Sequence, residues 1–168
     1  MGGAIIMNAG AFGGSISGTV DYVDVSRNGE IVRLGARDCG FGYRTSGFTD
    51  RDFIAGAGFV LSRRDRSAML AEMRGYCARR AETQPKGRSA GSIYKRADKP
   101  AGWYIERAGL KGLRRGGAVV SEKHANFILN DGTATAADVI SLMTEIERRV
   151  YETFGVALER EIKLVGEF

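Results

Sequence analysis

Residues typical of β-strands dominate the first third of the chain. Residues 20–27 are rich in β-branched and aromatic side chains, and residues 30–34 alternate between apolar and polar positions. The Asn-Gly pair at 28–29 between them is the pair that type I′ hairpin turns prefer. The pattern predicts a β-hairpin and a further strand over residues 53–62, with residues 41–46 as a strand or short turn at a binding face.

A helical period begins near residue 67 and predicts a helix from Ser67, acting as N-cap, to about Arg80. Residues 81–89 then read as a linker around Pro85, and we place the main domain boundary there. The apolar stripe of the helix is expected to be buried in the core and consists of Met69, Leu70, Met73 and Cys77.

The second half of the chain predicts a compact α+β unit. Residues 101–108 are expected to form a short helix that ends at Gly109. Residues 118–120 and 126–129 suit strands. The tail beyond residue 156 ends in a strand-like run of Ile162, Leu164 and Val165.

The strongest helical period follows Thr135. Thr135 and Asp138 resemble a capping box, with Asp in place of the usual Glu or Gln, and Gly155 is placed to end the helix. The role of this helix is packing. Its apolar positions are Val139, Leu142, Met143, Ile146, Val150 and Phe154.

Composition restricts the partners of this chain of 168 residues, which contains 24 glycines and 2 prolines. The net charge of +5 fits an anionic partner such as a diphosphate, or a solvated basic face. The basic residues are scattered and form no stripe with interleaved aromatic side chains. We therefore expect no nucleic-acid binding.

Cysteine and histidine usage restricts the chemistry. Cys39 and Cys77 have neither metal-ligand nor redox-motif spacing, so we expect two reduced thiols. His124 is the single histidine, which excludes a histidine-based catalytic triad and a multi-histidine metal site within one copy. Residues 1–14 lack the pattern of a signal peptide, and no apolar run reaches membrane-spanning length. We expect a soluble, cytoplasmic protein without a metal or a membrane partner.

A small-residue segment holds the clearest chemical candidate, the hydroxyl of Ser92. The segment reads Gly87-Arg88-Ser89-Ala90-Gly91-Ser92-Ile93-Tyr94-Lys95. Gly91 lets the backbone approach a ligand closely, because glycine has no Cβ. The segment alone is equally consistent with a turn that leads into a strand.

Several further blocks give this segment a context. In this order, together with the segment at 87–95, they resemble the UDP-N-acetylenolpyruvoylglucosamine reductase family, the flavoenzymes that make UDP-N-acetylmuramate for bacterial cell walls. The resemblance covers nearly the whole chain. It includes the glycine-rich residues 2–14, the Tyr-Arg-x-Ser block at 41–46, and residues 101–112, 116–127 and 161–167.

The resemblance implies an α+β fold with part of a flavin-binding domain, an antiparallel sheet with helices, before a smaller α+β substrate-binding domain. Residues 1–84 correspond to the C-terminal part of the FAD-binding region, 85–156 to the substrate-binding domain, and 157–168 to a tail that returns to the FAD-binding region. Members of the family begin with a further segment that carries much of the FAD site. Met1 is therefore interpreted as an internal start, a truncated reading frame or a boundary chosen for expression, and a separate N-terminal FAD-binding segment as a candidate partner.

The resemblance also implies a reaction and its residues. In the family, NADPH reduces bound FAD, and hydride then passes to the enolpyruvyl double bond of UDP-N-acetylglucosamine enolpyruvate. Ser92 matches the proton donor, and Arg44 matches the arginine that contacts substrate and flavin. Glu161 matches an acid that stabilises the enol form, acting from its protonated state, which burial favours. Without the resemblance, Arg44 reads as a structural ion-pair residue and Glu161 as a solvated acid.

The sequence separation between Arg44 and Ser92 resembles the smaller type of the family, which lacks an inserted loop carrying a tyrosine. The binding residues that the resemblance implies fall into two groups, one for substrate and one for FAD. Three positions depart from the usual pattern: Arg96, Val119 and Lys163. Substrate is assigned to Arg44, Tyr43, Gln84, Lys95, Arg96, Lys123 and His124, with Ser121 and Glu122 in the same block as the last two. FAD is assigned to Gly2, Gly3, Ala4, Asn8, Ala9, Gly10 and Lys163.

Two functions follow from these observations. The first is an NADPH- and FAD-dependent reductase with all three catalytic side chains present. The second is a flavin-free module that binds a UDP-sugar without turnover. The yellow colour of a flavoprotein would distinguish them.

Overall fold

The computed structural model describes residues 1–166 and has the antiparallel α+β fold that the sequence predicts. The chain divides into two compact units, Met1–Met73 and the residues from Arg74 onward. Each has its own sheet and its own core. None of the described helices is long and apolar enough to cross a membrane.

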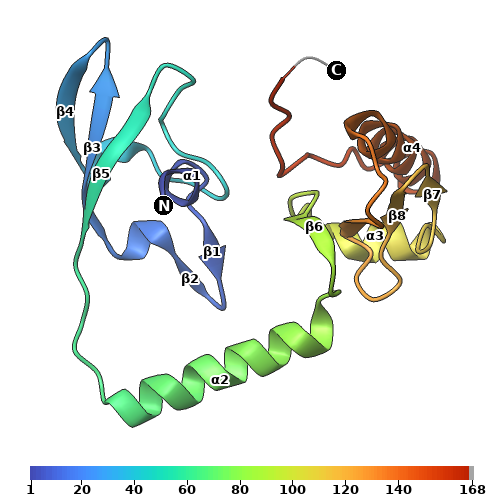
Figure 1. The fold of residues 1–168 in the computed structure, drawn as a ribbon, viewed down its shortest axis with the longest axis horizontal. Helices are drawn as coiled ribbons and strands as arrows, with labels where there is room; N and C mark the ends of the chain where they lie inside the picture. The colour runs from blue at the N-terminus through green and yellow to red at the C-terminus, as the bar shows by residue number, and fades with distance from the viewer. Residues whose placement is uncertain (167–168) are drawn as a thin grey trace. The chain divides into compact units, whose positions relative to one another are not determined.

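The first unit is built on a three-stranded antiparallel sheet in the order β4-β3-β5 (Figure 1). Asn28 and Gly29 join β3 to β4 with φ values of 51° and 86°, which confirms the predicted type I′ turn. The strand predicted over 53–62 ends earlier, at Phe59. The elements of this unit are α1 (Gly2–Ile6), β1 (Gly10–Ala11), β2 (Gly14–Ser15), β3 (Val20–Arg27), β4 (Glu30–Gly35), β5 (Phe53–Phe59) and the 3-10 turns Ile16–Gly18 and Ala36–Cys39.

One face of this sheet carries a small core. Val23 and Val25 of the central strand are fully buried, and Ile5 of α1 packs in the same cluster with Val20 and Cys39. Burial raises the pKa of the Cys39 thiol, so this cysteine stays protonated at neutral pH. The alternation along β3 therefore places its valines in the core.

The helix α2 (Arg66–Thr83) differs from its prediction at both its start and its packing. Its N-cap is Asp65, whose carboxylate accepts the Ala68 N–H at 2.8 Å, so the cap lies two residues before the predicted Ser67 cap. No residue of α2 is buried, and Met73 is 55% exposed, so the prediction of a buried stripe is wrong. A three- and four-residue period predicts an apolar face, but burial also requires a second surface.

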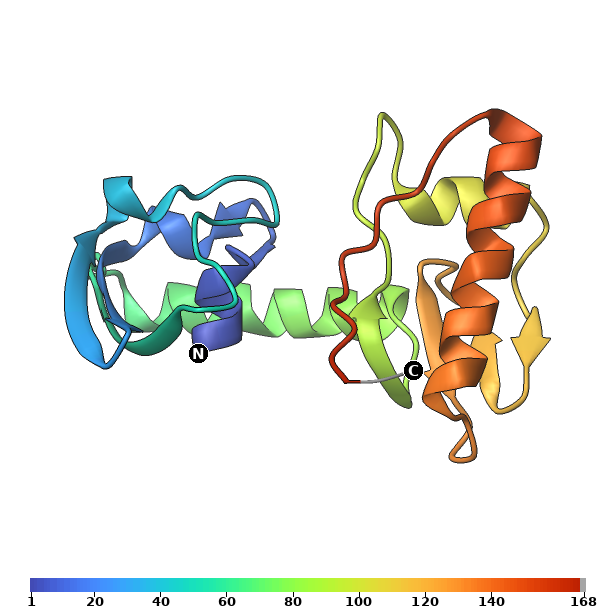
Figure 2. The same ribbon diagram turned by 90° about the horizontal axis from the view of Figure 1, so that it is seen from above.

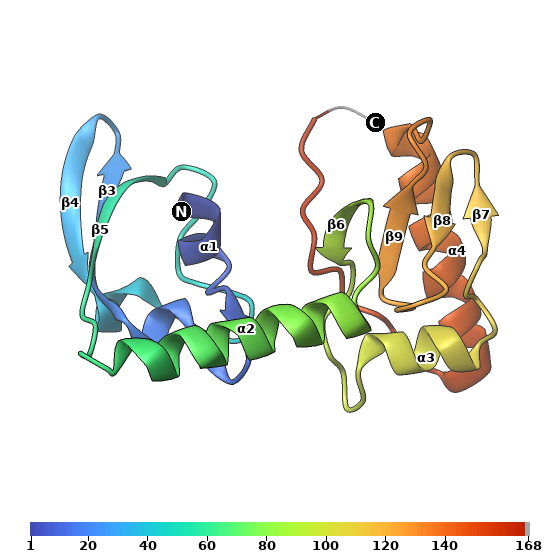
Figure 3. The same cartoon turned by 60° about the horizontal axis from the view of Figure 1, so that its bottom comes forward.

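The second unit is a four-stranded antiparallel sheet in the order β6-β9-β8-β7 (Figure 3). The predicted short helix is confirmed as α3, and Gly109 follows it with φ 69°. Side chains of α3, of α4 and of the sheet share one core cluster. The elements are β6 (Arg88–Ser92), α3 (Ala101–Arg107), β7 (Arg114–Arg115), β8 (Ala118–Val120), β9 (Phe127–Asn130) and α4 (Ala136–Phe154).

The helix α4 begins and ends as its sequence predicts. The Thr135 hydroxyl accepts the Asp138 N–H at 3.1 Å, and the Asp138 carboxylate accepts the Thr135 N–H at 2.9 Å. Gly155 ends the helix in the left-handed conformation. Leu142, Met143, Ile146 and Val150 are buried, while Val139 and Phe154 are partly buried against the same core.

The tail runs beside β6 without forming the expected strand (Figure 2). Arg160 pairs with Tyr94 in an isolated bridge, and the predicted run from Ile162 to Val165 is irregular. Val165 is 87% exposed, because the pairing ends before it. Glu167 and Phe168 lie outside the described residues. The functional boundaries at 84 and 156, and the return of the tail to a FAD-binding region, stay predictions.

Candidate active site

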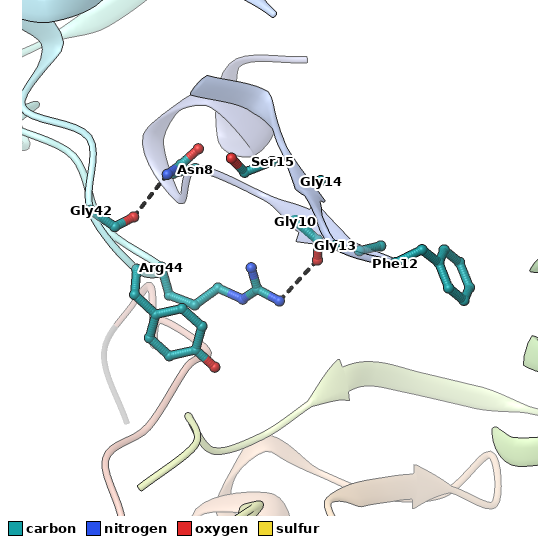
Figure 4. A pocket seen from close by; sticks show the side chains of 10 residues that line it. Asn8, Gly10, Phe12, Gly13, Gly14, Ser15, Gly42 and Arg44 are labelled. Atoms are coloured by element: carbon teal, nitrogen blue, oxygen red, sulfur yellow. Dashed lines mark hydrogen bonds between the residues drawn. The ribbon is translucent and has the colours of Figure 1, made fainter. Parts of the chain in front are cut away.

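A two-residue hairpin in the first unit bounds a cavity of about 470 Å³. Phe12 and Gly13 at its tip have φ values of 51° and 85°, the pair of positive values that a type I′ turn requires. A bulky aromatic residue is rare at such a φ. The ring of Phe12 extends from the tip, away from Arg44 (Figure 4). The cavity is lined by Asn8, Gly10, Ala11, Phe12, Gly13, Gly14, Ser15, Gly42, Tyr43 and Arg44.

Arg44 lies on a short turn that faces this hairpin. Gly42 and Thr45 pair with each other across the turn, and Arg44 has a φ of 54°. Its Nη2 donates to the Gly10 carbonyl at 2.9 Å, and its guanidinium lies 5.4 Å from the centre of the Tyr43 ring. The turn and the hairpin therefore hold a cation at the cavity wall (Figure 4).

Asn8, which precedes the hairpin, connects the turn that carries Arg44 to the 3-10 turn at Ile16–Gly18. Its side chain is buried, and Nδ2 donates to the Gly42 carbonyl at 2.8 Å, while Oδ1 accepts the Ser17 N–H at 3.0 Å. Because both groups of the amide are satisfied, Asn8 shapes the cavity through the backbone of the turn.

The hairpin fits the close approach of an anionic nucleotide cofactor. A Cβ on Gly10 would lie 2.7 Å from the Gly14 carbonyl oxygen and 3.1 Å from Arg44 Nη1, so only glycine fits there. Glycine backbone beside a guanidinium suits a planar group or a phosphate. Of the residues expected to contact FAD, Asn8 and Gly10 line the cavity, Gly2, Gly3 and Ala4 belong to α1, and Lys163 lies on the exposed tail.

Ser92 is the last residue of β6 in the second unit, next to an irregularity in the sheet. Ser89 pairs with Leu129 and Ser92 pairs with Phe127, so β6 contains one extra residue between the two pairs. Gly91 has a φ of 83° at this bulge. The predicted linker over residues 81–89 is therefore shorter than expected, because α2 continues to Thr83 and β6 begins at Arg88. The bulge gives Gly91 a conformation that favours glycine.

The tail brings Glu161 next to Ser92. The Glu161 N–H donates to the Ile93 carbonyl at 2.7 Å, and the Lys95 N–H donates to the Glu159 carbonyl at 2.8 Å. Lys95 also forms an ion pair with the Glu159 side chain at 2.6 Å. The half-buried Glu161 and the half-buried Ser92 therefore lie on adjacent antiparallel segments.

Two interactions connect this region to α4, a partly buried one from the tail and a buried one from the segment beside it. Arg160 binds the Glu147 carboxylate through Nε and Nη2, at 2.6 and 2.8 Å. The Tyr94 hydroxyl donates to the Met143 carbonyl at 3.0 Å, and burial together with the nearby Glu147 charge raises the pKa of Tyr94. The phenol is therefore neutral at physiological pH, and its role is structural.

Hydrogen bonds within the block of residues 121–126 organise a turn. The buried Ser121 hydroxyl accepts the N–H groups of Lys123 and His124 at 3.1 and 3.3 Å. His124 Nδ1 accepts the Asn126 N–H at 3.2 Å, and burial lowers the pKa of His124, so the neutral ring is favoured. Lys123 Nζ donates to the Ala81 carbonyl at 2.6 Å, in the last turn of α2.

The structure divides the expected site residues between the two units. Arg44 and Tyr43 belong to the first unit, while Ser92 and Glu161 belong to the second, on segments whose backbones are paired. Gln84 directly follows α2, and Arg96 is exposed beyond Lys95. The described part of the chain contains no group of three or more histidine, cysteine or acidic side chains that could hold a metal ion.

Two contributions were not found from sequence. The first is the hairpin tip at Phe12, which lines the cavity; a Phe-Gly pair between two short strands was the available signal. The second is Asn126, whose side-chain amide binds the backbone of Tyr94. A lone asparagine before a strand carries no such signal, because its partner lies 32 residues away.

Comparison with known proteins now identifies the family. The model of the UDP-N-acetylenolpyruvoylglucosamine reductase C-terminal domain matches residues 83–165. The chain is 44% identical over 169 residues to the UDP-N-acetylenolpyruvoylglucosamine reductase of Anaplasma marginale, and 41% identical to that of Geobacter metallireducens. The chain belongs to the UDP-N-acetylenolpyruvoylglucosamine reductase family.

A solved structure of a family member has the same fold. The crystal structure of UDP-N-acetylenolpyruvylglucosamine reductase from Thermus caldophilus matches 96% of this chain with a TM-score of 0.86 and 36% identity. The chain spans only part of these reductases: 56% of the length of the two relatives and 59% of the crystallised chain.

Proposed function

We propose that this protein is part of an NADPH- and FAD-dependent reductase, which converts UDP-N-acetylglucosamine enolpyruvate into UDP-N-acetylmuramate for peptidoglycan synthesis in the cytoplasm. The observation that carries the proposal is the pairing of the Ser92 and Glu161 segments through the bond from the Glu161 N–H to the Ile93 carbonyl. This bond places the backbone of Glu161 beside the residue that follows Ser92, at the edge of one sheet.

The proposed reaction needs a proton donor and stabilisation of an anion. FAD, held at the glycine-rich cavity and reduced by NADPH, would supply hydride to the β carbon of the enolpyruvyl group. The electron pair of the double bond then moves onto the carboxylate, which becomes an enediolate. Ser92 donates its proton to the α carbon, and Glu161 stabilises the enediolate with a hydrogen bond. Serine is a weak acid, but it can act because the intermediate is a strong base and the hydroxyl is held in place.

Arg44 has a separate role in this proposal. Its guanidinium presents a planar fork of donors at the wall of the glycine-rich cavity, where Gly10 already accepts one of its N–H groups. A guanidinium suits a carboxylate that gains negative charge, because its planar shape and fixed charge match the two oxygens. Tyr43, Lys95, Arg96, Lys123 and His124 are proposed to contribute to substrate binding, and Asn8, Ala9 and Gly10 to FAD binding.

The test measures flavin binding and NADPH oxidation in the same preparation. We expect the purified chain, alone or with the N-terminal half of a relative, to become yellow with FAD and to oxidise NADPH only when the enolpyruvyl substrate is present. The Ser92→Ala variant should keep flavin, while substrate reduction falls about 10²- to 10⁴-fold. The matched control is Ser26→Ala, a half-buried serine in β3, which should leave the rate unchanged.

The outcomes separate the two candidate functions. The second candidate, a UDP-sugar-binding module without flavin, is favoured by the partial coverage of the relatives. A colourless protein that binds a UDP-sugar in both arms of the experiment would support it. Normal turnover by Ser92→Ala would instead overturn the assignment of the proton donor.

A further inference from the structure

The buried side chain of Asn126 binds the backbone of one residue, Tyr94, through both halves of its amide. Oδ1 accepts the Tyr94 N–H at 3.0 Å, and Nδ2 donates to the Tyr94 carbonyl at 2.8 Å. The Asn126 backbone carbonyl also accepts the Ile93 N–H at 3.0 Å. Asn126 is 7% exposed, so water does not replace these bonds readily.

These hydrogen bonds lie directly beyond the end of the regular pairing between β6 and β9. The β6–β9 pairing shifts by one residue at the bulge and ends at Ser92 and Phe127. Beyond this pair, the side chain of Asn126 takes the place of a neighbouring backbone, because a primary amide offers the same donor and acceptor as a peptide group. The position of Tyr94 is therefore set by a side chain.

The same short segment holds the tail on its other side. The Ile93 carbonyl accepts the Glu161 N–H, and the Lys95 N–H donates to Glu159. Residues 93–95 thus lie between Asn126 and the tail. A shift of this segment would change the distance between the Ser92 hydroxyl and the Glu161 carboxyl.

We propose that Asn126 is a positioning residue, which sets the separation of Ser92 and Glu161 by fixing the backbone of residues 93 and 94. The inference rests on the proposed function, because it assigns those two side chains to one reaction step. An Asn126→Asp variant keeps the size of the side chain but loses the Nδ2 donor and places a carboxylate oxygen against the Tyr94 carbonyl. Displacement of a catalytic group by about 1 Å can cost about 10²-fold in rate.

The kinetic test measures the two half-reactions of the flavin-loaded protein separately. For Asn126→Asp, we expect reduction of the flavin by NADPH to stay within about twofold of wild type, since neither Ser92 nor Glu161 takes part in that step. We expect reoxidation of the flavin by the enolpyruvyl substrate to fall at least about tenfold, with most of the loss in kcat. Equal losses in both half-reactions would show a merely structural role, and an unchanged reoxidation rate would overturn the proposal.

The matched control is Asn130→Asp, in the same strand β9. Its Oδ1 accepts the N–H groups of Gly132 and Ala134 at 2.7 and 3.1 Å, which a carboxylate keeps, and its Nδ2 donates to the Ala134 carbonyl at 3.5 Å, which a carboxylate loses. The control therefore also loses an Nδ2 donor, but far from residues 93 and 94. The control variant should retain both half-reactions. A similar loss of reoxidation in this variant would also count against a specific role for Asn126.

A second measurement on the cofactor-free chain separates this inference from the proposed function. In Asn126→Asp, the backbone N–H groups of Tyr94 and Glu161 should exchange with solvent at least about tenfold faster than in Asn130→Asp. If wild type shows no turnover, the proposed function fails. Exchange rates then decide alone whether Asn126 fixes these segments, and equal rates in the two variants overturn the inference.

Discussion

Gly10 occupies the tightest position in the cavity of the first unit. We expect Gly10→Ala to weaken FAD binding by about tenfold or more, because the added Cβ would contact the Gly14 carbonyl at 2.7 Å and displace the hairpin from Arg44. Titration of the protein with FAD, followed by flavin fluorescence, measures the change. Gly18→Ala is the control, since no atom lies within 4 Å of its added Cβ, and equal weakening in the two variants would contradict the prediction.

Asp52 makes the stability of the first unit depend on pH in the acidic range. Its buried carboxylate accepts hydrogen bonds from Arg27 and from the Thr49 N–H, which lower the pKa of Asp52 to about 2. The folded-state pKa lies below the unfolded value, so this stabilisation is present above about pH 4 and is lost as the pH falls toward 2. We expect Asp52→Asn to lower the free energy of unfolding at pH 7, and the deficit to shrink between pH 4 and pH 2.

Denaturant titrations of wild type and Asp52→Asn at several pH values measure that deficit. Asp50→Asn is the matched control, an exposed acid two residues away, and it should change stability little at any pH. A deficit for Asp52→Asn that stays constant down to pH 2 would contradict the assignment of the stabilisation to the ionised carboxylate.

At the scale of single residues, the sequence predicts a positive φ only where the residue type favours it. Asn28-Gly29 and Gly155 announce their conformations because few residues tolerate a positive φ. Phe12 and Arg44 also have positive φ values, yet neither residue type signals one. Their backbone is set by the hairpin and by the facing turn, which are tertiary features that single positions do not encode.

The sequence marks both ends of the helix α4, with Thr135 as N-cap and Gly155 at the C-terminus. A substitution at Thr135 tests the N-cap. We expect Thr135→Ala to lower the free energy of unfolding by about 1 kcal/mol, because the Asp138 N–H loses its acceptor. Thermal or denaturant unfolding measures the change. Thr144→Ala, at an exposed mid-helix position where the hydroxyl bonds to the Ile140 carbonyl, should instead be neutral or stabilising by a few tenths of a kcal/mol.

The elements that were predicted well have strong local signals. The hairpin β3–β4, the helix α3 and the helix α4 combine a clear period with turn or cap residues. The predicted buried face of α2 failed because no residue of that helix is buried. The predicted strand at Ile162–Val165 failed for another reason: Ile162 packs against the core, but the tail pairs with its neighbour only in an isolated bridge at Arg160. The bulge at Gly91 was not predicted, because it depends on the register between β6 and β9.

At the scale of the molecule, the two units have cores of different size. Leu142, Met143 and Ile146 belong to the larger cluster of the second unit, and Val23 and Val25 to the smaller cluster of the first. Stabilisation rises by about 25 cal/mol for each Å² of apolar surface buried. We expect the backbone N–H groups around Val23 to exchange faster than those around Met143, measured by hydrogen exchange under native conditions. Equal protection of the two cores would contradict this expectation.

The candidate site residues could be predicted only in part from the sequence. The resemblance named Ser92 and Glu161, and the pairing of residues 93–95 with 159–161 places both residues on neighbouring segments of one unit. It could not name Asn126, because the bulge that makes its amide necessary arises only when β6 meets β9. Residues that carry chemistry are visible in a family pattern, whereas residues that hold others in place depend on the fold around them.

The bond from Lys123 Nζ to the Ala81 carbonyl joins the final turn of α2 to the block that contains His124. A free carbonyl near a helix end otherwise binds water and frays easily. Fraying of that turn would release the ammonium group, and loosening of the block would release the helix end. The two segments should therefore fluctuate as one cooperative unit. A perturbation at the end of α2 would then change the mobility of the turn that contains His124, while the sheet stays unchanged.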